Sequence, residues 1–299
     1  MRNFRFLHWL LLSFVILAIP ASSHAQVRVG VSIRVGPPAL PIYAQPICPG
    51  IGYIWTPGYW AYGDDGYYWV PGTWVLAPEP GFLWTPGYWG WGEGFYVWHR
   101  GYWGPHVGFY GGVHYGYGYG GVGFVGGEWR GREFFYNRNV SNVNVTVIHN
   151  TYNKTVVVNN VSRVSYNGGN GGINAQPTRE EQSAANERHI DPTAEQVQHR
   201  DAAGANRAQL ASVNHGRPGI AATPRPGAFN DRGVARANAR GERFNNNANE
   251  NRGGNRNNEM RPNKPDRQNN ARNQRNQKAH PSKPDHKPGK PDGRGERPR

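Results

Sequence analysis

The chain has 299 residues, of which 37% are hydrophobic and 13% aromatic, and its formal net charge is +14 at pH 7. Residues 26–200 carry 11 basic and 11 acidic side chains, whereas residues 201–299 carry 21 and nine, so the positive charge belongs to the C-terminal third. Cys48 is the single cysteine. It excludes an intramolecular disulfide framework and leaves a free thiol or an intermolecular disulfide open.

The N-terminus has the pattern of a signal peptide over residues 1–25. Arg2 and Arg5 precede an apolar run at residues 7–19, and small residues before and at Ala25 suit a signal peptidase. The run is shorter than the roughly 20 residues that a comfortable membrane span needs. We predict cleavage after Ala25 and export to the periplasm, the outer envelope or the extracellular space. An uncleaved N-terminal anchor is the alternative.

A W-x-P-G-x-W unit dominates the middle of the chain. It occurs at residues 55–60, 69–74 and 84–89, and a fourth copy at 98–103 reads WHRGYW. The first tryptophans of the four units are 14, 15 and 14 residues apart, which is too regular for chance. The fourth unit lacks the proline, because Arg100 occupies its place, and an end cap is the alternative to a turn at this unit.

The unit predicts small aromatic hairpins. Pro followed by Gly is typical of a type II turn, so we expect the two tryptophans of each unit to stand on opposite arms of one tight turn. The prediction is an antiparallel meander of strands four to six residues long within residues 51–136. The tryptophans are interpreted either as core alone or as core plus an interaction surface. The candidate binding residues are Trp55, Trp60, Trp69, Trp74, Trp84, Trp89, Trp98 and Trp103.

These units, each preceded nearby by Tyr or Phe, resemble the YXWGXW (WXXGXW) repeat family of secreted bacterial proteins. The resemblance covers about a sixth of the chain directly. It implies export, and it carries over no catalytic residue because no enzymatic activity is established for that family.

The segments around the repeat have other characters. Residues 26–50 are rich in proline and predict a linker. In the Gly/Tyr-rich stretch, Gly116, Gly118 and Gly121 match G-x-G-x-x-G, but without a strand before and a helix after them they do not indicate a dinucleotide site. An irregular aromatic extension of the sheet or a flexible loop is expected there. Alternating valines predict a β-hairpin over residues 137–166.

The predicted fold class is therefore mainly β, an aromatic-rich meander plus a hairpin, followed by a disordered basic tail over residues 167–299. Two short helices are expected in this tail, at 179–190 and 193–203. They follow capping-box spacings, Thr178 with Glu181 and Thr193 with Gln196.

No pattern in the sequence points to catalysis. His99, His106 and His114 lack the spacing of metal ligands, and the acidic residues Glu79 and Glu93 fall in predicted turns.

We expect a non-enzymatic protein without metal or cofactor and with a structural, adhesive or interaction role in the cell envelope. The alternative is a carbohydrate-binding accessory module that stacks sugars on exposed Trp and Tyr. Expected partners are envelope polysaccharide or protein, and anionic polymers for the basic tail, unless the tail is only a solvated tether.

Overall fold

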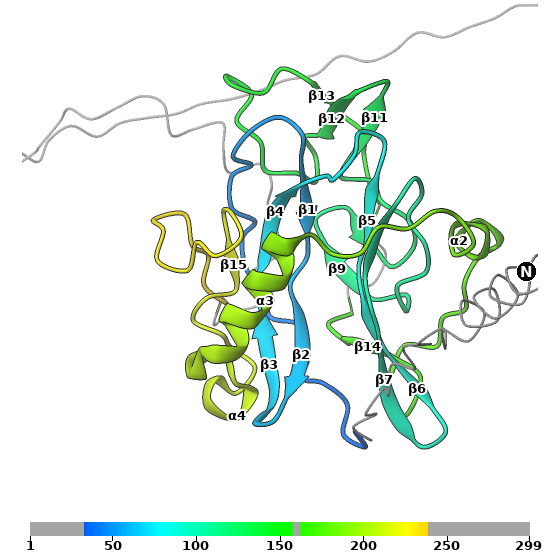
Figure 1. The fold of residues 1–299 in the computed structure, drawn as a ribbon, viewed down its shortest axis with the longest axis vertical. Helices are drawn as coiled ribbons and strands as arrows, with labels where there is room; N and C mark the ends of the chain where they lie inside the picture. Colours follow the sequence, from blue (N-terminus) through cyan, green and yellow to red (C-terminus); the bar gives the residue numbers. More distant parts are fainter. Residues whose placement is uncertain (1–32, 158–161, 239–299) are drawn as a thin grey trace, which may run out of the picture. The chain divides into compact units, whose positions relative to one another are not determined.

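The computed structural model describes residues 33–157 and 162–238 (Figure 1). The predicted signal peptide and the last 61 residues of the predicted tail, 239–299, lie outside the described residues. Within the described part the architecture is mainly β, built of small aromatic-rich sheets with a few short helices, as the sequence predicts. No described helix has the length and hydropathy needed to cross a membrane.

The first two units of the repeat form one long hairpin. Its strands are β1 (Tyr53–Thr56), β2 (Tyr59–Gly63), β3 (Gly66–Val70) and β4 (Gly72–Leu76). β1 pairs with β4 and β2 with β3, both antiparallel, so that Trp55 lies opposite Trp74 and Trp60 opposite Trp69. The chain reverses at Asp64–Asp65, just before Gly66, whose φ is 96°.

The third and fourth units repeat this arrangement. The strands are β5 (Leu83–Thr85), β6 (Tyr88–Gly92), β7 (Phe95–His99) and β8 (Tyr102–Gly104). Trp84 lies opposite Trp103 and Trp89 opposite Trp98. At the reversal Glu93 and Gly94 have φ of 53° and 88°, and two positive φ values are typical of a type I′ hairpin turn. The fourth unit thus pairs in full despite its missing proline.

The prediction that each Pro-Gly closes a tight turn is wrong, since the dipeptide joins two successive strands of the same arm, as Pro57-Gly58 joins β1 to β2. The reason lies in the packing of each unit's glycine. A Cβ on Gly72 would lie 2.6 Å from Cζ2 of Trp55, and one on Gly101 would lie 2.5 Å from Cζ2 of Trp84. The first tryptophan of a unit covers the glycine of the unit on the opposite arm, so Gly is needed for close approach.

The four cross-strand tryptophan pairs stabilise the two hairpins. Their ring centroids lie 5.2 or 5.3 Å apart at interplanar angles between 54° and 67°. Such tilted and edge-to-face pairs contribute about 0.5–1.5 kcal/mol each beyond the burial of their area. The two hairpins also bind each other, because Trp89 Nε1 donates to Trp60 O at 2.7 Å and Tyr59 stacks on Trp98 at 4.9 Å.

The Gly/Tyr-rich stretch packs as an irregular aromatic extension. It contains β9 (His114–Gly116) and β10 (Tyr119–Gly120). Buried tyrosines tie it to the second hairpin: Tyr119 Oη donates to Trp84 O at 2.8 Å, and Tyr115 Oη donates to Gly87 O at 2.6 Å. Of the two interpretations left open by the sequence, the structure therefore agrees with the extension rather than the flexible loop.

The valine-rich segment does not form the predicted hairpin in the described residues. The structure instead has a three-stranded sheet of β11 (Gly127–Arg130), β12 (Glu133–Asn137) and β13 (Thr151–Tyr152). In this sheet β13 runs parallel to β12. Between β12 and β13 the alternation breaks into turns, because Asn144 Oδ1 accepts from the Thr146 amide at 3.0 Å and from its hydroxyl at 2.6 Å. Such local side-chain bonds compete with strand pairing. Val147 is 61% exposed.

Residues 33–50 are not a linker in the structure. Leu40, Tyr43 and Cys48 are buried in the main core. The segment also supplies carbonyl acceptors for buried indoles, because Trp74 Nε1 donates to Pro46 O at 2.8 Å and Trp60 Nε1 to Ala39 O at 3.3 Å. A buried Trp N–H needs such a partner, and the segment's prolines still offer their carbonyls.

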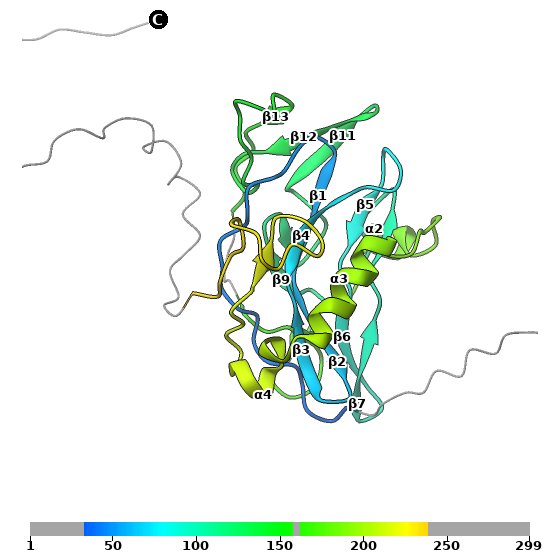
Figure 2. The ribbon, with the colours of Figure 1, turned by 60° about the vertical axis from the view of Figure 1, so that its left-hand side comes forward.

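Residues 162–238 pack back onto the hairpins, so the predicted disorder is corrected for residues 167–238. The elements are β14 (Tyr166–Asn167), α2 (Arg179–Ala184), α3 (Ala194–Ala205), η1 (Arg207–Gln209), α4 (Ala211–Asn214) and β15 (Ala222–Thr223). β14 pairs in parallel with β6 and β15 with β4. α3 lies along the first hairpin beside β3 (Figure 2). Both predicted capping boxes form, and α2 ends six residues earlier than predicted.

Replacing a covered glycine should destabilise the fold. In Gly101→Ala the new methyl would meet Trp84 Cζ2 and, at 2.6 Å, Thr85 O, so overpacking should lower the free energy of unfolding by about 1–3 kcal/mol. Gly92→Ala is the matched control, because nothing lies within 4 Å of its Cβ position and its φ is not positive. Urea unfolding followed by tryptophan fluorescence measures both; equal stability of the two variants would contradict the packing argument.

The Cys48 thiol should be inert in the folded protein. It is 4% exposed, and burial raises its pKa to about 11, with the thiol also donating to Gly50 O at 3.1 Å. Since the thiolate is the reactive form, labelling by a disulfide reagent at pH 8 should be about 100-fold slower than in urea. Labelling at the same rate with and without urea would show that Cys48 is accessible.

Candidate ligand-binding cavity

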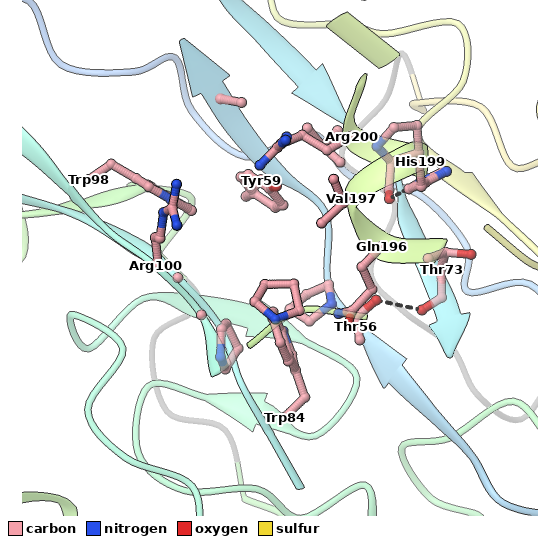
Figure 3. Close-up of a pocket in the computed structure, with 18 of the residues that line it drawn as sticks. Thr56, Tyr59, Thr73, Trp84, Trp98, Arg100, Gln196, Val197, His199 and Arg200 are labelled. Atoms are coloured by element: carbon pink, nitrogen blue, oxygen red, sulfur yellow. Dashed lines mark hydrogen bonds between the residues drawn. The ribbon is translucent and has the colours of Figure 1, made fainter. Parts of the chain in front are cut away.

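A cavity of about 600 Å³ lies between the two hairpins and the inner side of α3 (Figure 3). Its size falls within the range of small-molecule sites, about 300–1,000 Å³. The third position of every repeat unit lines it, and these positions hold Pro57, Pro71, Pro86 and Arg100. The repeat therefore builds two sides of the cavity, and the segment after it builds the third.

The structure divides the eight predicted binding tryptophans into two groups. Trp55, Trp60, Trp69, Trp74 and Trp103 are at most 1% exposed and do not line the cavity. All five belong to the main aromatic core. The remaining three, Trp84, Trp89 and Trp98, line the cavity. Trp84 and Trp89 are also buried in aromatic clusters, at 7% and 5% exposure, and a binding role for any of the eight stays a prediction.

Two arginines give the cavity its polar character. Arg200 on α3 donates to Asp201 Oδ1 from Nε at 2.9 Å and from Nη2 at 2.7 Å. Arg100 is exposed and makes no ion pair or side-chain hydrogen bond with any residue of the described part of the chain. Sequence reasoning noted Arg100 only as a departure from the repeat and missed Arg200, because nothing predicts that α3 folds back over the hairpins.

Burial and the charges of the Arg200 and Arg100 guanidinium groups affect the pKa of the Tyr59 hydroxyl. Burial raises the pKa of Tyr59 well above its ordinary value, and the positive charges of Arg200 and Arg100 act in the opposite direction. The hydroxyl is thus neutral at physiological pH and keeps a proton to donate. Its ring is fixed by the stack on Trp98, with 17° between the planes.

Specific side-chain contacts hold α3 against the cavity. Gln196 Oε1 accepts from Trp103 Nε1 at 2.8 Å. His199 is 2% exposed, and its Nε2 lies 2.9 Å from Pro71 O while Nδ1 accepts from the Gly227 amide at 3.0 Å. This pattern fixes a neutral imidazole with the proton on Nε2. Burial lowers the pKa of His199, against the smaller opposing effect of its bond to Pro71.

His99, His106 and His114 do not come together in the structure. His99 stacks on Tyr88 at 4.5 Å, and His106 Nδ1 lies 2.8 Å from Glu187 Oε1. Among residues 33–157 and 162–238 no three His, Cys, Asp or Glu side chains are placed to hold a metal ion. Glu79, one of the turn acids, forms a two-point ion pair with Arg188 at 2.7 and 2.9 Å.

Two equivalent hairpins, each closed by tryptophans packed over glycines, define an aromatic β-scaffold built from a duplicated unit. The family model of the WXXGXW repeat matches the chain in two copies, at residues 50–75 and 80–103. The chain carries this repeat, as its sequence predicts, and each matched copy spans one hairpin. Neither the comparison with curated proteins nor that with solved structures gives a match.

The stability of the protein should depend on pH through His199. Because its pKa is lower in the folded protein, the unfolded chain binds more protons below about pH 6.5, and stability is lost as the pH falls from 7.5 to 5. The single proton sets an upper limit of about 1.4 kcal/mol per pH unit. His199→Gln should be less stable at pH 7.5 and should lack this part of the slope.

The control variant is His149→Gln, which changes an exposed histidine. Urea unfolding of the three proteins at several pH values gives the comparison. The free-energy gap between wild type and His199→Gln should narrow on acidification, whereas the gap to His149→Gln should stay constant. A constant gap for both variants would contradict the assignment of His199.

Proposed function

We propose that this protein is an exported, non-enzymatic component of the cell envelope with a structural or adhesive role, in which the aromatic β-scaffold binds envelope polysaccharide or protein. The observation that carries the proposal is the use of the repeat itself: five of its eight tryptophans build a rigid frame, and three face a cavity of ligand size. A rigid frame suits binding, because little conformational entropy is lost when a partner is held.

The basic C-terminal region adds a second, less specific mode of attachment in this proposal. Residues 201–299 carry 21 basic and nine acidic side chains. Such a segment attracts anionic polymers through screened electrostatics, with strong dependence on salt. The scaffold would then select the partner, and the charged region would hold the protein close to anionic envelope material.

A carbohydrate-binding accessory module is the second candidate function. Trp91 is 40% exposed and is the most open tryptophan among the described residues, so they contain no flat platform of several exposed indoles. The cavity is a better candidate for a sugar, since aromatic rings and planar polar side chains such as Arg100 and Gln196 line it together.

A comparison of the mature chain, residues 26–299, with a version ending at residue 238 tests the two modes. On heparin columns the full chain should elute at higher salt, because the shorter version lacks 16 basic and seven acidic residues. On glycan arrays both should give the same pattern, since both keep the scaffold. No interaction of either kind in the purified mature chain would remove the basis of the proposal.

A further inference from the structure

We propose that the cavity binds a sugar ring bearing a carboxylate, a uronic acid residue, and that Arg100 is the residue that recognises the carboxylate. This inference rests on the proposed function, because it names the class of envelope polysaccharide that the scaffold would hold. Figure 3 shows the region concerned, where Arg100 from the second hairpin and Arg200 from α3 lie on either side of Tyr59.

The departure of the fourth repeat unit is the first argument. Three of the four equivalent cavity positions hold proline, which offers no side-chain donor, and the fourth holds Arg100. The fold does not require this change, because the fourth unit keeps the same cross-strand pairing and its glycine lies under Trp84 as in the other units. The arginine therefore changes the chemistry of the cavity and leaves the hairpin intact.

The charges around Arg100 are the second argument. Asp201 already binds the guanidinium of Arg200, whereas Arg100 has no carboxylate partner in the described residues. The nearby Tyr59 hydroxyl is protonated and can donate. A planar guanidinium forms two parallel hydrogen bonds with a carboxylate, which are stronger than bonds between neutral groups. Arg100 is therefore the donor in the cavity that a ligand carboxylate would pair with.

The rest of the cavity indicates a sugar rather than a more highly charged ligand. Asp191 lines it and has no ion-pair partner within the described segments, so a second negative group of the ligand would be repelled. Its carboxylate oxygens can accept hydrogen bonds from hydroxyl groups. Trp84, Trp98 and the three prolines of the repeat give the cavity apolar surface, against which the C–H groups of a sugar ring would pack. A volume of about 600 Å³ is also far larger than a simple anion requires.

Tryptophan fluorescence of the mature chain tests the inference, since residues 130–299 contain no tryptophan and the basic tail cannot produce the signal directly. The probes are a trimer of galacturonic acid and the neutral galactose trimer. The uronic acid trimer should shift the emission and bind at least about tenfold more tightly than the neutral one. Its affinity should fall with rising salt.

Variants of Arg100 complete the test. Arg100→Gln should weaken the uronic acid trimer by about tenfold or more and leave the neutral trimer unaffected. Arg100→Lys should recover part of the affinity, because it keeps the charge and loses the paired geometry. Arg132→Gln, at an exposed position outside the cavity, is the control and should bind like wild type. Circular dichroism and urea unfolding verify that each variant is folded.

The outcomes separate this inference from the proposed function. Equal binding of both trimers would support a sugar-binding scaffold and overturn the role of Arg100. The same conclusion follows if folded Arg100→Gln binds the uronic acid trimer like wild type. Tighter binding of a thymidine oligonucleotide in the same assay would overturn the sugar assignment. No binding of any probe, together with an empty glycan array, would count against both proposals.

Discussion

The packing of an indole over the glycine of the opposing strand is the contact on which the rest of this structure depends. It allows two backbones to approach closely enough for Trp55 to pair with Trp74 and for Trp84 to pair with Trp103. Any side chain larger than hydrogen at the glycine would push the indole away. The two hairpins share one geometry because both meet this steric requirement. The four tryptophan pairs add their own stabilisation.

Buried indoles also favour an acceptor for their N–H groups, and Trp55, whose buried Nε1 has no partner in the described residues, is an exception. The hairpins supply one of these acceptors themselves, when Trp89 donates to Trp60 O. Others come from segments far away in sequence: Trp74 donates to Pro46, Trp69 to Ala221 and Trp103 to Gln196. The segments before and after the repeat are therefore parts of the same core. Residues 33–50 and 167–238 have few aromatic residues of their own, yet they supply acceptors to the buried indoles.

The sequence predicts what is local and fails where the determinants are distant. The mainly β class and the repeat family follow from a six-residue unit that recurs at a regular step, and both capping boxes follow from residues three positions apart. The Pro-Gly turns were predicted wrongly, because the dipeptide suits a turn and the steric need for Gly72 comes from Trp55 on the other arm. The folding back of residues 162–238 could not be predicted either, since its anchors are carbonyls and single side chains such as His199 that leave no periodic pattern. For the same reason the sequence does not predict the cavity: Trp84, Trp89 and Trp98 are three of eight candidate binding residues, and Arg100 only marks a departure from the repeat.

The reciprocal cover between opposing arms has a consequence for how such chains can lengthen. A unit inserted alone would bring a glycine with no indole to shield it and an indole with no glycine to rest on. The number of repeat units should therefore be even. A duplication that keeps the packing adds two units at a time, as one closed hairpin with its own reversal. The two matched copies, each containing two units, obey this rule. An odd unit at either end would leave a solvent-facing apolar seam that invites association with a second chain.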